Sequence, residues 1–92
     1  MGVRIQYDEG KNQKNIRKHG LSFETASIAF DDPGAVVIYD DTHSDSEERY
    51  NLIGAVGSHI LFIAYTVRSE TIRVISARPA TRREKETYYE RR

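Results

Sequence analysis

The sequence predicts one α+β domain over residues 1–92, with the element order β-α-α-β-β-β-β-α. A chain of 92 residues has material for one hydrophobic core and little else. Helix signals stand in the first third, strand-like segments with short connections follow, and a helix-capping motif stands near the end. Short connections join antiparallel neighbours, so we expect a four-stranded antiparallel meander with two preceding helices and one following helix.

The first elements are a short strand and a polar helix. Val3–Tyr7 alternates apolar and polar residues, as a half-buried strand does. Asp8 is suited to cap a helix running to about Lys18, and Gly20 to end it. This helix either lies thinly on the core or uses one polar face for binding. That face holds Lys11, Asn15 and Lys18.

Ser22 is suited to cap a second helix that extends to about Phe30. Three apolar residues at helical spacing should face the core; they are Phe23, Ala26 and Phe30. A turn over Asp31–Gly34 leads into Ala35–Tyr39, which is predicted to be a buried strand because all five side chains are apolar or aromatic.

Three further strands complete the predicted meander. They are Arg49–Val56, His59–Val67 and Thr71–Ala77. Gly57 and Ser58 suit a tight hairpin between the first pair, and Pro79 ends the last strand because it has no N–H to donate. Thr81 and Glu84 then form a capping box at the start of a C-terminal helix.

Composition excludes several classes of protein. The chain has no cysteine, which excludes a disulfide scaffold, a thiolate zinc site and a cysteine nucleophile. Its longest apolar-rich run, Ile60–Val67, is far shorter than the ~20 residues of a membrane span, and the N-terminus has no apolar signal segment. We therefore expect a cytoplasmic protein with no membrane partner.

The zero net charge hides three blocks of different sign. Residues 1–30 carry five basic and three acidic side chains, residues 31–48 carry seven acids and no base, and residues 49–92 carry nine bases and four acids. Arginine dominates the last block, and its guanidinium binds phosphate oxygens in pairs. The block is either a solvated face or a local anion site; the neutral whole argues only against indiscriminate binding to nucleic acid.

Arg73 lies inside the last predicted strand and needs either solvent or an acidic partner on a helix. Strict alternation places Arg73 and Arg78 on opposite faces of that strand. His43 lies among the acids of the 40–48 loop, which favour its protonated form. It is a candidate general acid or base, a hydrogen-bonded organiser of the loop, or a metal ligand. His19 is suited either to a helix C-terminus, where the dipole favours a cationic imidazole, or to catalysis, and His59 is suited to the surface.

The chain resembles the BrnT-type toxins of bacterial toxin–antitoxin pairs, a branch of the RelE-like ribonucleases. The resemblance covers nearly the whole chain. It rests on Tyr7–Lys11, Asn15, Lys18–Gly20, Ser22, Phe23, Ala26, Phe30–Pro33, His43, Ser44, Glu47–Arg49, Arg73–Arg78, Glu84 and Tyr88. Tyr7 and Pro79 depart from it, because tryptophan and a basic residue are common at these places.

The resemblance implies a RelE-like fold and cleavage of RNA without a metal or other cofactor. It also implies a BrnA-like antitoxin with a ribbon-helix-helix DNA-binding part. DNA would then be met only indirectly, when the toxin–antitoxin complex represses its own promoter.

Such cleavage is consistent with attack of the ribose 2′-hydroxyl on the adjacent phosphate. This reaction needs a base, cations for the phosphorane charge and an acid for the leaving oxygen. The predicted catalytic residues are Arg49, Arg73 and Arg78 for charge, with His43 or Glu48 for protons. The predicted RNA-binding residues are Lys11, Lys18, Arg68, Arg82, Arg83 and Tyr88.

Two other functions are compatible with the residues. The arginine surface suits a non-catalytic module that docks an antitoxin or another acidic partner. The acids of residues 40–48 suit, less well, a metal-dependent nuclease that EDTA would inhibit.

Overall fold

The computed structural model describes residues 4–43 and 47–90. In these ranges the strands are β1 (Arg4–Tyr7), β2 (Val36–Asp40), β3 (Arg49–Val56), β4 (His59–Arg68) and β5 (Thr71–Pro79). The helices are α1 (Glu9–His19), α2 (Phe23–Ala26) and α3 (Arg82–Glu90), with short 3-10 segments η1 (Ser27–Asp31) and η2 (Asp41–His43). The predicted α+β class and element order are confirmed.

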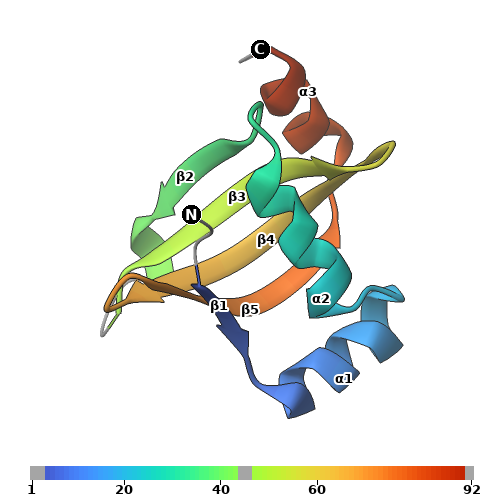
Figure 1. Ribbon diagram of the computed structural model, residues 1–92. Helices are drawn as coiled ribbons and strands as arrows, with labels where there is room; N and C mark the ends of the chain where they lie inside the picture. The colour runs from blue at the N-terminus through green and yellow to red at the C-terminus, as the bar shows by residue number, and fades with distance from the viewer. Residues whose placement is uncertain (1–3, 44–46, 91–92) are drawn as a thin grey trace.

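The strands form one five-stranded sheet in the order β1-β5-β4-β3-β2 (Figure 1). Strands β2 to β5 are the expected antiparallel meander. The N-terminal strand β1 lies beside β5 and runs parallel to it, so the first and last strands lie together at one edge of the sheet. Val3, which begins the predicted strand, is outside the described residues.

Helix α1 begins and ends as predicted. The Asp8 carboxylate accepts a hydrogen bond from the Lys11 N–H, and Gly20, at φ 67°, donates its N–H to the Ile16 carbonyl. The side of this polar helix that faces the core carries the amide side chains of Asn12 and Asn15, which are both buried, where most helices carry apolar side chains. Asn15 therefore belongs to the contact with the core and cannot lie on a binding face.

The second helix is shorter than predicted. α2 ends at Ala26 and the chain tightens into η1 up to Asp31. The Ser27 hydroxyl donates to the Phe23 carbonyl, and the Asp32 N–H reaches the Ala29 carbonyl, three residues back. The tighter path sets Ala29 against Gly54 of β3, where an added Cβ would lie 3.0 Å from the Ala29 carbonyl oxygen.

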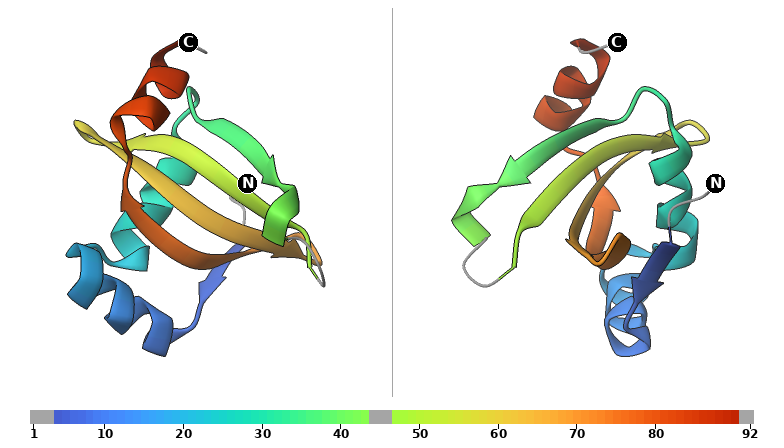
Figure 2. Two further views of the ribbon diagram at one scale, coloured as in Figure 1. Left: turned by 180° about the vertical axis from the view of Figure 1, so that it is seen from behind. Right: turned by 60° about the vertical axis from the view of Figure 1, so that its left-hand side comes forward.

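The sheet packs on both faces (Figure 2). On one face α1, α2 and η1 enclose a cluster that includes Phe23, Leu52, Ile63 and Val74. On the other face Tyr88 of α3 packs in a second cluster, which includes Val36, Ile53 and Ile60. No helix of the described residues other than α3 lies on this second face, so the part away from α3 is open to solvent or a ligand among those residues.

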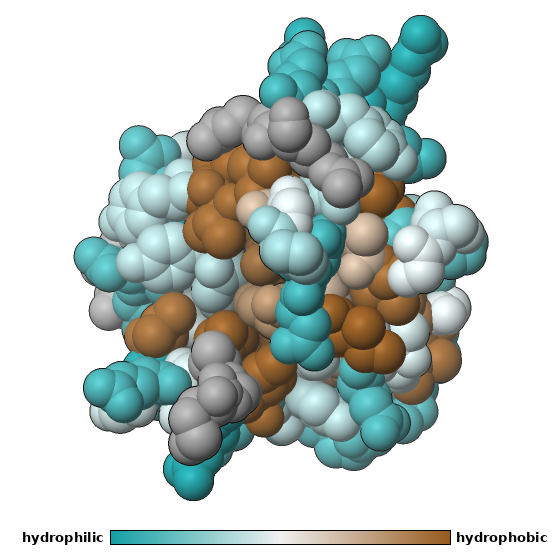
Figure 3. Space-filling model, turned by 45° about the horizontal axis from the view of Figure 1, so that its top comes forward, coloured by the Kyte–Doolittle hydropathy of each residue, from teal (hydrophilic) through white to brown (hydrophobic). Residues whose placement is uncertain are grey.

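Strand β2 is an edge strand, and the prediction that it is buried is wrong. Val36 is buried, but Val37, Ile38 and Tyr39 are 53%, 41% and 48% exposed. Apolar content alone does not tell an edge strand from a central one; the sheet order does. Figure 3 shows apolar patches reaching the surface between hydrophilic side chains.

Candidate functional site

A β-bulge interrupts β5 at Ile75. Tyr65 of β4 pairs with Val74, and the preceding Ala64 pairs with Ser76, so that Ile75 is an extra residue on its strand. An extra residue reverses the in-and-out alternation of the side chains that follow it.

The bulge places Arg73 and Arg78 on the same face of the sheet. The expectation of opposite faces assumed strict alternation, and it is wrong. Val74 and Ala77 both lie in the core on the side of α1 and α2, at 2% and 0% exposure. Arg73 and Arg78, next to them in the chain, therefore both turn away from that side.

Strand register aligns one row of residues across all five strands. From β2 to β1 its members are Asp40, Arg49, Thr66, Arg73 and Gln6. Paired residues on neighbouring strands point to the same side, so Arg49 and Arg73 share the face that carries Arg78. We call this surface the arginine face.

Distances along the sheet set the size of the arginine face. Arg49 and Arg73 are separated by β4 alone, which corresponds to about 10 Å between their Cα atoms. Arg78 pairs with Phe62, and Phe62 lies four residues from Thr66 along β4, about 13 Å away. The three predicted arginines thus come from distant parts of the sequence to one surface.

Arg73 is exposed, and it makes no hydrogen bond or ion pair with any described residue. The alternative that an acid on a helix holds it is therefore wrong. Its side chain lines an open pocket of about 420 Å³ with Ile5, Gln6 and Tyr7, at the edge where β1 meets β5. All five N–H donors of its guanidinium are available to an anion.

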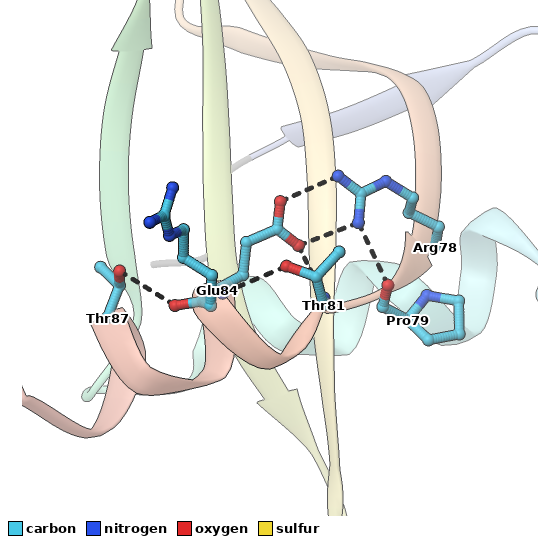
Figure 4. A network of polar contacts seen from close by, with 6 residues as sticks. Arg78, Pro79, Thr81, Glu84 and Thr87 are labelled. Atoms are coloured by element: carbon cyan, nitrogen blue, oxygen red, sulfur yellow. Dashed lines mark hydrogen bonds and ion pairs between the residues drawn. The ribbon is translucent and has the colours of Figure 1, made fainter.

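Arg78 is held in place by α3 (Figure 4). Its two terminal nitrogens donate to the two carboxylate oxygens of Glu84, both at 2.9 Å, and one also donates to the Pro79 carbonyl. The guanidinium lies 4.3 Å from the centre of the Phe62 ring. The hydrogen bond to Glu84 raises the pKa of Arg78, which partial burial alone would lower.

Glu84 is also the acid of the predicted capping box, which is confirmed. It accepts from the Thr81 N–H, and its own N–H donates to the Thr81 hydroxyl. Burial alone would raise the pKa of Glu84; the hydrogen bonds from Arg78 and Thr81 and the Arg78 charge outweigh it, so the pKa lies below its ordinary value. The carboxylate joins the start of α3 to the arginine face.

Thr66 lies between the two arginines of the row. It is 4% exposed, and its hydroxyl has no hydrogen-bond partner among the described residues. A buried hydroxyl without a partner costs about 1–3 kcal/mol. Sequence reasoning missed Thr66, although its place follows from the register once the strands are paired.

The two predicted proton-transfer residues are placed differently. The side chain of His43 lies outside the described part of the structure. Glu48 is exposed, and its carboxylate accepts a hydrogen bond from the Tyr50 hydroxyl at 3.1 Å. Tyr50 stacks on Tyr65 on the face opposite to the arginine face, so the structure does not bring Glu48 to Arg49. The bond to Glu48 raises the pKa of Tyr50.

The predicted RNA-binding residues do not form one patch. Lys11 and Lys18 are exposed on α1, and Arg82 and Arg83 are exposed on α3; Figure 1 shows these helices below and above the sheet. Arg68, at the β4–β5 hairpin, forms an ion pair with Glu47. Each exposed residue of this set could therefore contact RNA only separately, and the set does not form one continuous RNA-binding surface.

Tyr88 is placed where RNA cannot touch it. Its side chain is 2% exposed, and its hydroxyl donates to the Asp32 carboxylate at 2.6 Å. The assignment of Tyr88 to RNA binding is therefore wrong in this structure, because the ring anchors α3 to the sheet.

A second cavity, of about 330 Å³, lies at the other end of β3, β4 and β5. Its lining includes His19, His59 and Lys85, which come from three different elements. Sequence reasoning did not bring the two histidines together, because α1 and the β3–β4 hairpin are far apart in the chain. Two histidines that line one cavity are candidates for a base and an acid, so this cavity is the rival to the arginine face.

The described residues offer neither a metal-binding cluster nor a membrane-spanning helix. In the ranges 4–43 and 47–90, no group of three or more His, Cys, Asp and Glu side chains is placed to hold a metal ion. Among the helices of those ranges, none has the length and apolarity that crossing a bilayer requires.

The fold and the arginine face define a small α+β protein with a sheet surface suited to phosphate-containing ligands. Comparison with known families gives the particular assignment: residues 7–84 match the family described as ribonuclease toxin, BrnT, of type II toxin–antitoxin system. The chain belongs to that family, as the sequence resemblance predicted. Comparison with curated proteins gives no match. Membership makes this chain a ribonuclease toxin of the type II class and implies an antitoxin partner.

Proposed function

We propose that this toxin is a metal-independent endoribonuclease that cleaves RNA by attack of the ribose 2′-hydroxyl on the adjacent phosphate. The observation that supports it is the shared row of Arg49 and Arg73, with Arg78 on the same face. Cleavage would leave a 2′,3′-cyclic phosphate and a free 5′-hydroxyl, and would arrest translation and growth in the cytoplasm.

Arg73 is the first candidate for stabilising the phosphorane charge. It is exposed and unpaired among the described residues, and its planar guanidinium is suited to bind two phosphate oxygens at once. Arg49 shares its row, so the two guanidinium groups are suited to approach one phosphate from either side of Thr66. Arg78 is third, because a phosphate must compete with Glu84 for it.

His43 is the first candidate for proton transfer. Its chain position is three residues after Asp40, the first member of the row. Glu48 is second, since its carboxylate must leave Tyr50 to reach the arginine face. The 2′-hydroxyl would lose its proton to one group, and the 5′-oxygen would gain a proton from another.

We infer that the antitoxin is BrnA-like, with a ribbon-helix-helix DNA-binding part. The toxin would then meet DNA only within the toxin–antitoxin complex. The family match supports an antitoxin, and the identity of that protein follows from the resemblance alone.

Purified toxin incubated with single-stranded RNA and EDTA tests the proposal. We expect products with cyclic-phosphate and 5′-hydroxyl ends, read by mass spectrometry, and we expect Arg73→Ala to lower the rate by about 10²–10³. Arg17→Ala, an exposed arginine on α1, is the matched control and should leave the rate unchanged.

Each contrary outcome identifies a different function or a different catalytic centre. Inhibition by EDTA indicates a metal-dependent nuclease. Loss of cleavage in His19→Gln or His59→Gln, with Arg73→Ala unaffected, moves the centre to the second cavity. If correctly folded toxin still binds its antitoxin but leaves the RNA intact, the protein is a docking module without catalysis.

A further inference from the structure

The outer edge of β2 is open and apolar. β2 ends the sheet order, so among the described residues no strand pairs with its outer side. An edge strand presents unpaired N–H and C=O groups, which natural proteins usually protect with charges, proline or a covering element. Here three consecutive large side chains, Val37, Ile38 and Tyr39, are each more than 40% exposed.

Acidic side chains flank this edge at both ends. Asp31 precedes β2 and Asp41 follows it, and both are exposed. Residues 31–48 carry seven acids and no base. The edge therefore combines an apolar centre with negative ends.

A second copy of the chain is a poor occupant. Antiparallel pairing of two β2 strands about Ile38 would set Asp40 and Asp41 of each copy opposite Val36 and Ala35 of the other, at the end of the strand that Asp31 and Asp32 precede. Acidic side chains of both copies would accumulate at each end of the new pair, which disfavours it. A strand with basic ends would instead be attracted to the acids at both ends of β2.

The aromatic side of β2 favours the same occupant. Tyr39 is 48% exposed and packs edge-to-face on Tyr50, whose hydroxyl bonds to Glu48. An exposed tyrosine ring beside a carboxylate is a surface on which a lysine or arginine of a partner is able to rest.

We propose that the antitoxin adds a strand to the outer edge of β2 through a segment with an apolar centre and basic ends. The inference rests on the family's antitoxin partner, but not on the chemistry of RNA cleavage. Main-chain hydrogen bonds would give the affinity, and the flanking acids would set the direction and the choice of partner. The antitoxin thereby holds the toxin at a place other than the arginine face.

The test compares two lysine substitutions at exposed valines. Val37→Lys puts a charge on the open edge, and Val67→Lys puts the same charge on the interior strand β4, at a residue that pairs with Ile72 of β5. The probe is the antitoxin that restores growth when it is co-expressed with this toxin. Hydrogen exchange of the free and bound toxin and dissociation constants at low and high salt are the measurements.

We expect the β2 amides to gain protection in the complex. Val37→Lys should weaken binding at least about tenfold, and Val67→Lys should change it less than about twofold. The double variant Asp31→Lys, Asp41→Lys should weaken binding at low salt and lose that effect at high salt.

Unchanged β2 exchange in the complex, or equal effects of the two lysine substitutions, would overturn the proposal. A free toxin that is dimeric and becomes monomeric on Val37→Lys would also overturn it, in favour of a second copy. Because none of these readouts uses RNA, a toxin that fails the cleavage test and still gains β2 protection separates this proposal from the proposed function.

Discussion

Asn15 offers the sharpest test of how the fold positions β5. Its side-chain amide donates to the Leu21 carbonyl at 2.9 Å and to the Ala77 carbonyl at 2.8 Å, and its oxygen accepts from the Ala77 N–H at 3.2 Å. These bonds tie α1 to β5 two residues after the bulge at Ile75. Asn15→Leu keeps the bulk and removes all of them.

The expected loss is about 3 kcal/mol, since each of these bonds contributes about 1 kcal/mol net and burial of leucine offsets the orphaned Ala77 groups. For 92 residues, total stability is about 5–14 kcal/mol, so the variant should still fold. Urea unfolding followed by circular dichroism should show the midpoint falling by about 2–3 M at a slope near 1 kcal/mol/M.

Lys14→Ala, at an exposed position on the same helix, is the control and should change stability by less than about 0.5 kcal/mol. If Asn15→Leu lowers the free energy of unfolding by less than about 1 kcal/mol, the Ala77 backbone finds other hydrogen-bond partners. The buried amides would then not be what holds α1 on the sheet.

Three further variants test separate contacts. Thr66→Val should raise stability by about 1 kcal/mol in thermal unfolding, because it removes a buried hydroxyl that has no partner; a lower midpoint would show that the hydroxyl is bonded. Gly54→Ala should cost about 1–3 kcal/mol, since its Cβ would meet the Ala29 carbonyl oxygen at 3.0 Å, and an unchanged midpoint would contradict this crowding. Glu84→Gln should destabilise the protein above about pH 5 and lose that effect as the pH falls towards 3: the pKa of Glu84 is lowered by folding, so its contribution is full above the unfolded pKa and disappears as the folded carboxylate is protonated. A wild-type minus variant difference that stays constant from pH 7 to 3 would refute that linkage.

Local signals in the sequence predicted the elements that local contacts define. The caps at Asp8 and Gly20 and the box of Thr81 and Glu84 are hydrogen bonds between residues at most four apart, and all are present. The hairpin at Gly57 has the positive φ that glycine permits. Such features depend on a few neighbouring residues, and the sequence shows those directly.

Features set by pairing across the fold were not predictable in the same way. The bulge at Ile75 has no marker in the run of residues around it, yet it decides that Arg73 and Arg78 share a face. The exposure of Val37 depends on the place of β2 in the sheet order. Glu84 was assigned to a cap, and only the structure shows that the same carboxylate holds Arg78.

The charge blocks of the sequence acquire a spatial meaning in the sheet. Arg49 begins β3 directly after Glu47 and Glu48, and the strand that pairs with its outer side is the acid-flanked β2. The positive charge of the arginine face would attract a phosphate backbone, and the acids that flank β2 would repel it. A basic protein segment would be attracted to the β2 edge and repelled from the arginine face. If both proposals hold, RNA and antitoxin would be sorted by charge to neighbouring surfaces of one domain whose net charge is zero. An antitoxin anchored at β2 would need only a short extension to cover Arg49, two strands from Arg73, and so to exclude RNA from the row.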